Sequence, residues 1–167
     1  MKRRGFNPLF LFILMAPGLV LGLPEDREKP INLEANSAQF DQISGVSTYQ
    51  GNVVVTQGTM RLTADIAKIY IREGEFRRME AEGAPTTFRY KPTADKEVIN
   101  GEGRRVEYDV GSARVIVTDN AKFTQGQDVF TGDRIEYDLN KDLVTANSNK
   151  GGRVKITIQP KSKKLPQ

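Results

Sequence analysis

From residue 31 onward, apolar and polar residues alternate along the chain, and turn-forming residues interrupt the alternation every seven to ten positions. Valine, isoleucine, threonine, tyrosine and phenylalanine dominate the alternating segments. A period of two predicts half-buried strands, and many short, evenly spaced strands are typical of sandwiches, rolls and barrels. Only residues 77–82 are compatible with a helix, and they are too few to nucleate one alone. The pattern predicts an all-β protein.

One face of each predicted strand is apolar, and the residues between are mostly polar or charged, as at Gln39, Arg72, Glu107 and Lys122. Each predicted sheet therefore has one solvent-exposed polar face and one apolar face. The predicted inward residues are Ala38 and Phe40, Val53 and Val55, Ile69 and Ile71, Val106, Tyr108 and Val110, Val115 and Val117, Ala121 and Phe123, and Ile135, Tyr137 and Leu139.

The chain also repeats itself. A shift of 68 residues aligns residues 36–70 with 104–138 and gives eight identities in 35 positions. A third copy of the aromatic-Asp corner occurs at Tyr137 and Asp138. Such a repeat indicates one hairpin unit stacked on further copies of itself. The aspartates that follow the aromatic residues, Asp41, Asp109 and Asp138, are predicted to be turn formers rather than catalytic groups.

The N-terminal residues have the features of a cleavable signal peptide. Lys2, Arg3 and Arg4 precede an apolar run that Pro17 and Gly18 interrupt, with a possible cut after residue 22. The alternative is a retained membrane anchor, although the uninterrupted run is shorter than the roughly 20 residues that a spanning helix needs. The expected organisation is a signal peptide at 1–22, a lead at 23–30, one β-domain at 31–160 and a basic tail at 161–167.

Composition and charge narrow the possible functions. The chain has neither Cys nor His, which excludes disulfides, Ser-His-Asp machinery and HExxH zinc sites. We therefore expect neither an enzyme nor a cofactor nor a metal site. Residues 23–149 contain 16 basic and 21 acidic residues, a net charge of −5. A nucleic-acid-binding protein usually has a basic face over its folded body, and no such face is evident here.

One set of motifs resembles the OstA-type family of lipopolysaccharide-transport proteins. It runs from Ala38-Gln39-Phe40-Asp41 through Gly45 and the segment 49–58 to Leu62-Thr63-Ala64-Asp65, and the segment 132–138 resembles the family in the second half. The resemblance covers about residues 30–160. It implies a twisted antiparallel β-jellyroll of two sheets, slightly open like a V, with an apolar trough for lipid acyl chains. In position, Ile31, Leu33, Phe88, Tyr108 and Val110 match interior residues of the family's trough.

What the resemblance implies for function is a periplasmic bridge that binds lipid A acyl chains and carries lipopolysaccharide. Its partners would be an inner-membrane export complex, an outer-membrane translocon and further copies joined end to end. An acyl chain of about twelve carbons costs on the order of 10 kcal/mol to expose to water, at about 0.8 kcal/mol per methylene. The expected lipid-binding residues are Ile31, Leu33, Phe40, Val53, Val55, Phe88, Tyr108, Val110, Phe123 and Tyr137.

The first and last strands, predicted near residues 31–35 and 153–159, should have open hydrogen-bonding edges. Strand addition by partners is expected at both. The edge residues are Ile31 and Leu33 in the first strand and Val154, Ile156 and Ile158 in the last.

Several alternatives remain at this point. Periodicity alone favours an ordinary sealed core, because packed sheets normally fill their interior. A membrane-anchored member of the same family would retain residues 1–22. A carbohydrate-binding or adhesive β-sandwich would be expected to expose Trp or Tyr platforms, yet the chain has no Trp and Tyr108 and Tyr137 are predicted to point inward. A glycosidase would need two inward carboxylates about 5–10 Å apart, and the predicted inward positions are apolar.

Overall fold

The computed structural model describes residues 26, 29–149 and 152–160. This part of the chain contains ten β-strands and no α-helix, as predicted. The predicted signal peptide at 1–22 and the predicted basic tail at 161–167 lie outside the described residues. The strands are β1 (Asn32–Glu34), β2 (Ser37–Asp41), β3 (Val46–Gln57), β4 (Met60–Arg72), β5 (Glu75–Tyr90), β6 (Ile99–Asp109), β7 (Arg114–Gln125), β8 (Asp128–Asp138), β9 (Leu143–Asn147) and β10 (Lys155–Thr157).

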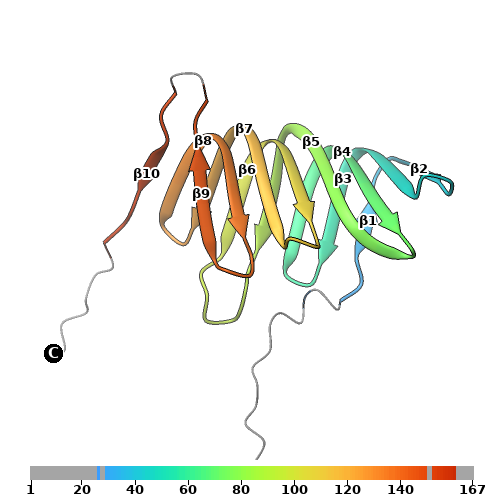
Figure 1. Cartoon of the computed structure of the whole chain (residues 1–167), viewed down its shortest axis with the longest axis horizontal. Helices are drawn as coiled ribbons and strands as arrows, with labels where there is room; N and C mark the ends of the chain where they lie inside the picture. The colour runs from blue at the N-terminus through green and yellow to red at the C-terminus, as the bar shows by residue number, and fades with distance from the viewer. Residues whose placement is uncertain (1–25, 27–28, 150–151, 161–167) are drawn as a thin grey trace, which may run out of the picture.

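All pairs in the sheet are antiparallel, and β3 to β8 pair in sequence order as successive hairpins. The two ends of the sheet follow a different rule. At one end both β1 and β2 pair with β3, and at the other both β9 and β10 pair with β8. Each end therefore consists of two short strands that cover successive halves of one long strand (Figure 1).

The long strands bend near their middle, where the pairing register shifts between each of the neighbouring pairs from β3–β4 to β7–β8. β-Bulges of this kind bend a strand and increase its twist. The bends divide one continuous sheet into two layers, so the two predicted sheets are halves of a single sheet. Layer A comprises β1, residues 53–57, 60–64, 86–90, 99–103, 121–125 and 128–132, and β10. Layer B comprises β2, residues 46–50, 66–72, 75–82, 105–109, 114–118 and 134–138, and β9.

The two layers form a V whose bends lie along the top of Figure 1 and whose hairpin turns lie along the bottom. We call the side with the hairpin turns the mouth. The rings of Phe123 in layer A and Tyr137 in layer B have centroids 5.3 Å apart, so the apolar faces of the layers pack against each other. The hydrophobic core lies between the layers and includes residues from every strand from β3 to β8.

The predicted repeat is confirmed at the level of the backbone. A positive φ occurs at consecutive residues in the bend of β3, at Gly51 and Asn52, and again 68 positions later in the bend of β7, at Asp119 and Asn120. The Ile71 amide donates to the Gly45 carbonyl over 2.8 Å, and the Leu139 amide donates to the Ala113 carbonyl over 2.9 Å, again with a shift of 68. Further positive-φ pairs at this spacing are Gly45 with Ala113, Gly58 with Gly126, and Gly74 with Asp142.

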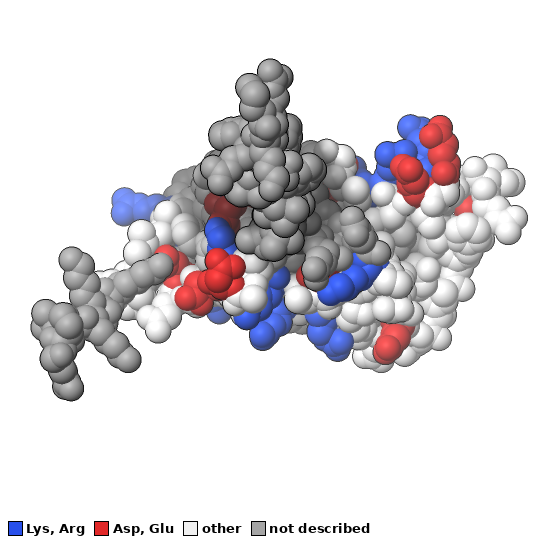
Figure 2. All heavy atoms as spheres, turned by 90° about the horizontal axis from the view of Figure 1, so that it is seen from below, with Lys and Arg blue, Asp and Glu red and all other residues white. Residues whose placement is uncertain are grey.

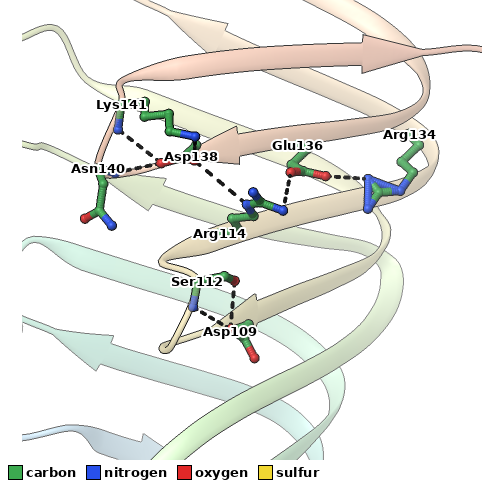
Figure 3. A network of polar contacts seen from close by, with 8 residues as sticks. All are labelled: Asp109, Ser112, Arg114, Arg134, Glu136, Asp138, Asn140 and Lys141. Atoms are coloured by element: carbon green, nitrogen blue, oxygen red, sulfur yellow. Dashed lines mark hydrogen bonds and ion pairs between the residues drawn. The ribbon is translucent and has the colours of Figure 1, made fainter.

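The aspartates at the strand ends act as turn formers, as predicted. Asp109 accepts hydrogen bonds from the Ser112 amide and hydroxyl, each at 2.7 Å, and Asp138 accepts from the amides of Asn140 and Lys141 at 3.1 Å (Figure 3). Asp41 does the same for the turn between β2 and β3. These contacts satisfy backbone donors that each turn leaves unpaired.

The outer face of layer B carries a ladder of ion pairs. Arg114 lies 3.3 Å from Glu136 and 3.8 Å from Asp138, and Arg134 lies 3.1 Å from Glu136 (Figure 3). The side chains other than Asp138 are partly exposed, so each pair contributes little to stability. The ladder confirms that the charged positions between the apolar ones face solvent.

Residues 77–82, the one segment compatible with a helix, are part of β5 and pair with β4 and β6. Two local predictions differ from the structure. The first and last strands are shorter than predicted, since β1 begins after Ile31 and β10 excludes Val154 and Ile158. Phe40 lies opposite the buried Ser47, hence on the inward side of β2, yet it is 56% exposed. It is exposed because β2 is a terminal strand of layer B with no further strand beside it among the described residues.

Candidate lipid-binding site

The candidate site is the apolar space between the two layers, and four aromatic rings fill its C-terminal half. Phe123 is at the centre, with centroid distances of 6.4 Å to Phe88, 6.0 Å to Phe130 and 5.3 Å to Tyr137. Strand alternation within each layer directs these side chains inward, and the bend of β8 lies between Phe130 in layer A and Tyr137 in layer B. The rings offer a wide apolar surface, and the Tyr137 hydroxyl is the one polar group that they carry.

The N-terminal half of the interior contains an apolar hollow. Phe76 and Tyr108 stand on one side of it, with ring centroids 6.0 Å apart. Its open volume is about 10 Å³, the room that a single water molecule needs. The hollow is lined by Ile31, Val55, Gln57, Met60, Leu62, Ile69, Phe76, Met79 and Tyr108. A hollow of this size is too small for a fatty acyl chain.

The structure brings most of the predicted lipid-binding residues together. Six of them are at most 7% exposed in the core: Val53, Val55, Phe88, Tyr108, Phe123 and Tyr137. Ile31, Leu33 and Val110 are partly buried and pack against this core near its margin. Phe40 is set apart from the others by its exposure on β2.

The lead before β1 is fixed to the turn between β3 and β4. Asp26 accepts a hydrogen bond from the Thr59 amide at 2.9 Å, and the Gln57 side chain donates to the Lys29 carbonyl at 3.0 Å. Burial opposes ionisation of Asp26, but the hydrogen bonds from Thr59 outweigh it and hold the pKa of this carboxyl below its usual value. These contacts place Ile31 at the hollow.

A polar cluster centred on Asp142 joins the two layers at the mouth. Asp142 lies in the turn between β8 and β9 of layer B, and its Oδ2 is 2.7 Å from Lys96 Nζ in the loop between β5 and β6 of layer A. Its Oδ1 accepts from Gln125 Nε2 at 3.4 Å and from the Tyr137 hydroxyl at 2.9 Å.

These hydrogen bonds shift the pKa values of Asp142 and Tyr137. The Lys96 ammonium, together with Tyr137 and Gln125, holds the pKa of Asp142 below its usual value, and burial together with Asp142 raises the pKa of the Tyr137 hydroxyl. Sequence reasoning missed this cluster, because residues 46 positions apart in two turns give no pattern along the chain.

Charges of both signs line the mouth. Figure 2 views the molecule from this side and shows acidic and basic side chains interspersed over the part that is not grey. An acidic and polar recess of about 870 Å³ adjoins the Asp142 cluster, between the turns of the two layers and Gln159 and Pro160.

Both ends of the sheet have exposed apolar residues. At the C-terminal end Ile156 is 52% and Ile158 69% exposed, and Leu143 on β9 is 51% exposed. At the N-terminal end Phe40 lies on β2, and the fully exposed Ile43 lies in the turn that follows it. The outer edges of β1, β2, β9 and β10 pair with no other strand of the described chain, so their backbone groups are open to partners.

The residues that the structure describes include no helix long and apolar enough to span a membrane.

Comparison with known proteins places this architecture among proteins of lipopolysaccharide transport. The family described as LptA/(LptD N-terminal domain) LPS transport protein matches residues 32–143. The chain is 36% identical to the lipopolysaccharide export system protein LptH of Pseudomonas aeruginosa, covering 93% of this chain and 95% of the relative. It is 29% identical to the lipopolysaccharide export system protein LptA of Escherichia coli K12, covering 92% and 87%.

A solved structure gives the same result for the fold. The crystal structure of LptH from Pseudomonas aeruginosa, described as the LptA-homologous periplasmic component of the conserved lipopolysaccharide transport device, superimposes with a TM-score of 0.77 at 35% identity. The match covers 82% of this chain and all of that one. The predicted jellyroll is thereby confirmed.

Proposed function

The chain belongs to the family of LptA and the LptD N-terminal domain, and from this membership we propose that it is a periplasmic bridge that binds lipopolysaccharide and carries it between the two membranes. The observation that carries the proposal is the V of two layers with apolar inner faces, in a chain similar to LptH over nearly its whole length. Acyl chains would lie between the layers while sugars and phosphates stay in water at the mouth.

The physical requirement for such a carrier is removal of acyl chains from water without tight binding at any one position. Each buried methylene contributes about 0.8 kcal/mol. A lining of aliphatic and aromatic side chains supplies this along the whole interior and imposes few polar contacts that would fix the lipid. The chemistry at the site is thus binding and transfer.

The open sheet ends would serve assembly. We propose that the β1–β2 end and the β9–β10 end add strands from an inner-membrane export complex, an outer-membrane translocon or a second copy of the chain. Exposed Ile156 and Ile158 at one end and Phe40 at the other support docking there. The signal peptide predicted at 1–22 would direct the protein to the periplasm.

Site-specific photo-crosslinking tests the proposal. A photoreactive residue at Phe88 or Tyr108, both buried between the layers, should form an adduct with lipopolysaccharide in cells that make it. The matched controls are the outward neighbours Arg89 and Glu107 on the same strands, which should give little or no adduct. Absence of an adduct at every interior position would refute the lipid-carrier function.

A further inference from the structure

We propose that Asp142 is the centre of a clasp that holds the mouth closed next to the β8–β9 turn and that has to release when an acyl chain is admitted. The clasp consists of Asp142, Lys96, Gln125 and Tyr137. This inference rests on the proposed lipid-carrier function, but the state of the mouth can be measured without lipid.

The interior has to open before it can hold an acyl chain. The hollow between the layers has an open volume of about 10 Å³, and the aromatic half is filled by packed rings. At the top of the V each long strand passes continuously from one layer to the other through its bend. Separation of the layers therefore takes place at the mouth, where hairpin turns of the two layers meet without a covalent connection.

The clasp is the place where charged side chains hold these turns together. In the part of the chain described by the structure, Lys96–Asp142 is the one ion pair that links a turn of layer A to a turn of layer B. The remaining pairs within the sheet stay inside one layer, for example Lys122 with Glu102 in layer A and Arg78 with Glu107 in layer B. Gln125 adds a second contact from layer A to the same carboxylate.

Tyr137 connects the clasp to the interior. Its ring packs against Phe123, whereas its hydroxyl donates to Asp142 Oδ1 over 2.9 Å. An acyl chain that displaces the ring also draws the hydroxyl away from the carboxylate. Occupation of the interior and release of the clasp are thus mechanically coupled through one side chain.

The clasp is strong enough to favour the closed state of the mouth and weak enough to release. The side chains of Lys96 and Asp142 are 48% and 36% exposed, so water screens their attraction. Pairs of this kind shift an equilibrium by about two- to five-fold. A carrier that loads and unloads repeatedly needs a contact of this size rather than a permanent bridge.

Distance measurements across the mouth test the clasp. The chain has no cysteine, so Gln127→Cys in layer A and Gly111→Cys in layer B give one spin-label pair at exposed turn positions. Asp142→Asn removes the charge and keeps the turn, because Asn tolerates the φ of +51° at this position. In the absence of lipid, Asp142→Asn and Lys96→Met should each shift the distribution to longer distances, and the double variant should add little to either.

The control is Lys122→Met, which breaks an ion pair of similar exposure inside layer A and should leave the distances unchanged. Purified lipopolysaccharide should bind the two clasp variants about two- to five-fold faster than the parent or the control. Distances in both clasp variants equal to those in Lys122→Met would overturn the clasp. Failure of lipopolysaccharide to bind even the parent would instead overturn the carrier function, and the lipid-free distances would still decide on the clasp.

Discussion

Gly101 shows how a single residue shapes the interior. A Cβ at this position would overlap the ring of Phe88, which is 4% exposed and in turn packs against Phe123. The missing side chain on β6 therefore leaves the space that the ring of Phe88 occupies. Because Phe88 is enclosed on its other sides, it has no room to move away from an added methyl group.

We predict that Gly101→Ala destabilises the protein by about 1–3 kcal/mol, the usual effect of overpacking a core. The measurement is urea unfolding followed by circular dichroism. Gly111→Ala is the matched control, since its Cβ would meet nothing closer than Asp109 Oδ1 at 3.6 Å, and its stability should change by less than about 0.5 kcal/mol. Equal stability of the two variants would contradict the role of Gly101.

At the residue scale, the sequence predicts which side chains point inward but not how deeply each is buried. The alternation of Val115, Val117 and Tyr137 places them correctly, because a strand has a fixed period of two. Phe40 has the right orientation and remains exposed, since burial depends on neighbouring strands that no local pattern specifies. The contact between Lys96 and Asp142 depends on the meeting of two distant turns and is equally invisible in the sequence.

At the scale of elements, the bends turn long hairpins into a two-layered jellyroll. In the bends of β3 and β7, consecutive residues take a positive φ: Gly51 and Asn52, then Asp119 and Asn120. Glycine adopts this conformation without steric cost, and Asn or Asp adopts it more readily than other residues. Since Asn52 and Asn120 are exposed, their side chains contribute little packing, and the backbone conformation is the main demand on them.

We predict that Asn120→Val lowers the free energy of unfolding by about 1–2 kcal/mol, because a β-branched residue is strained at a φ of +63°. Asn52→Val, at a φ of +50° in the equivalent bend, should have an effect of similar size. Thermal or urea unfolding provides the measurement. Asn120→Gly and Asn52→Gly serve as controls, and their free energies of unfolding should stay close to that of the parent. A valine variant as stable as its glycine counterpart would show that the bend does not require a positive φ.

The elements themselves are largely predictable, and their bending is not. Period-two alternation and the 68-residue repeat indicate the strands and their stacking in order. The bounds of β1 and β10 were overestimated because the apolar alternation continues past the last backbone pairs, as at Ile158. The bends interrupt the alternation by only one or two residues, so the sequence alone does not distinguish them from turns between separate strands.

At the scale of the whole molecule, the sheet is open at both ends. The terminal strands β1 and β10 contain three residues each, and β2 and β9 contain five. Short terminal strands are one way in which proteins limit unwanted edge pairing. The apolar side chains of β9 and β10 are nevertheless exposed, which favours a specific partner at this end.

We predict that the protein associates end to end through these strands and that Ile156→Lys combined with Ile158→Lys weakens association roughly ten-fold. The two changes remove apolar area from the contact and place charges on the edge, and about 1.4 kcal/mol corresponds to a factor of ten. Light scattering over a range of concentrations measures the mass. Ile66→Lys, on the outer face of β4 and several strands away from β9 and β10, replaces an isoleucine that is 39% exposed and should leave association unchanged. Two results would contradict this prediction: a parent protein that remains monomeric at every concentration, or a control that weakens association as much as the double variant. Either result would show that the open edges do not join copies of the chain, which would leave the ends to other partners.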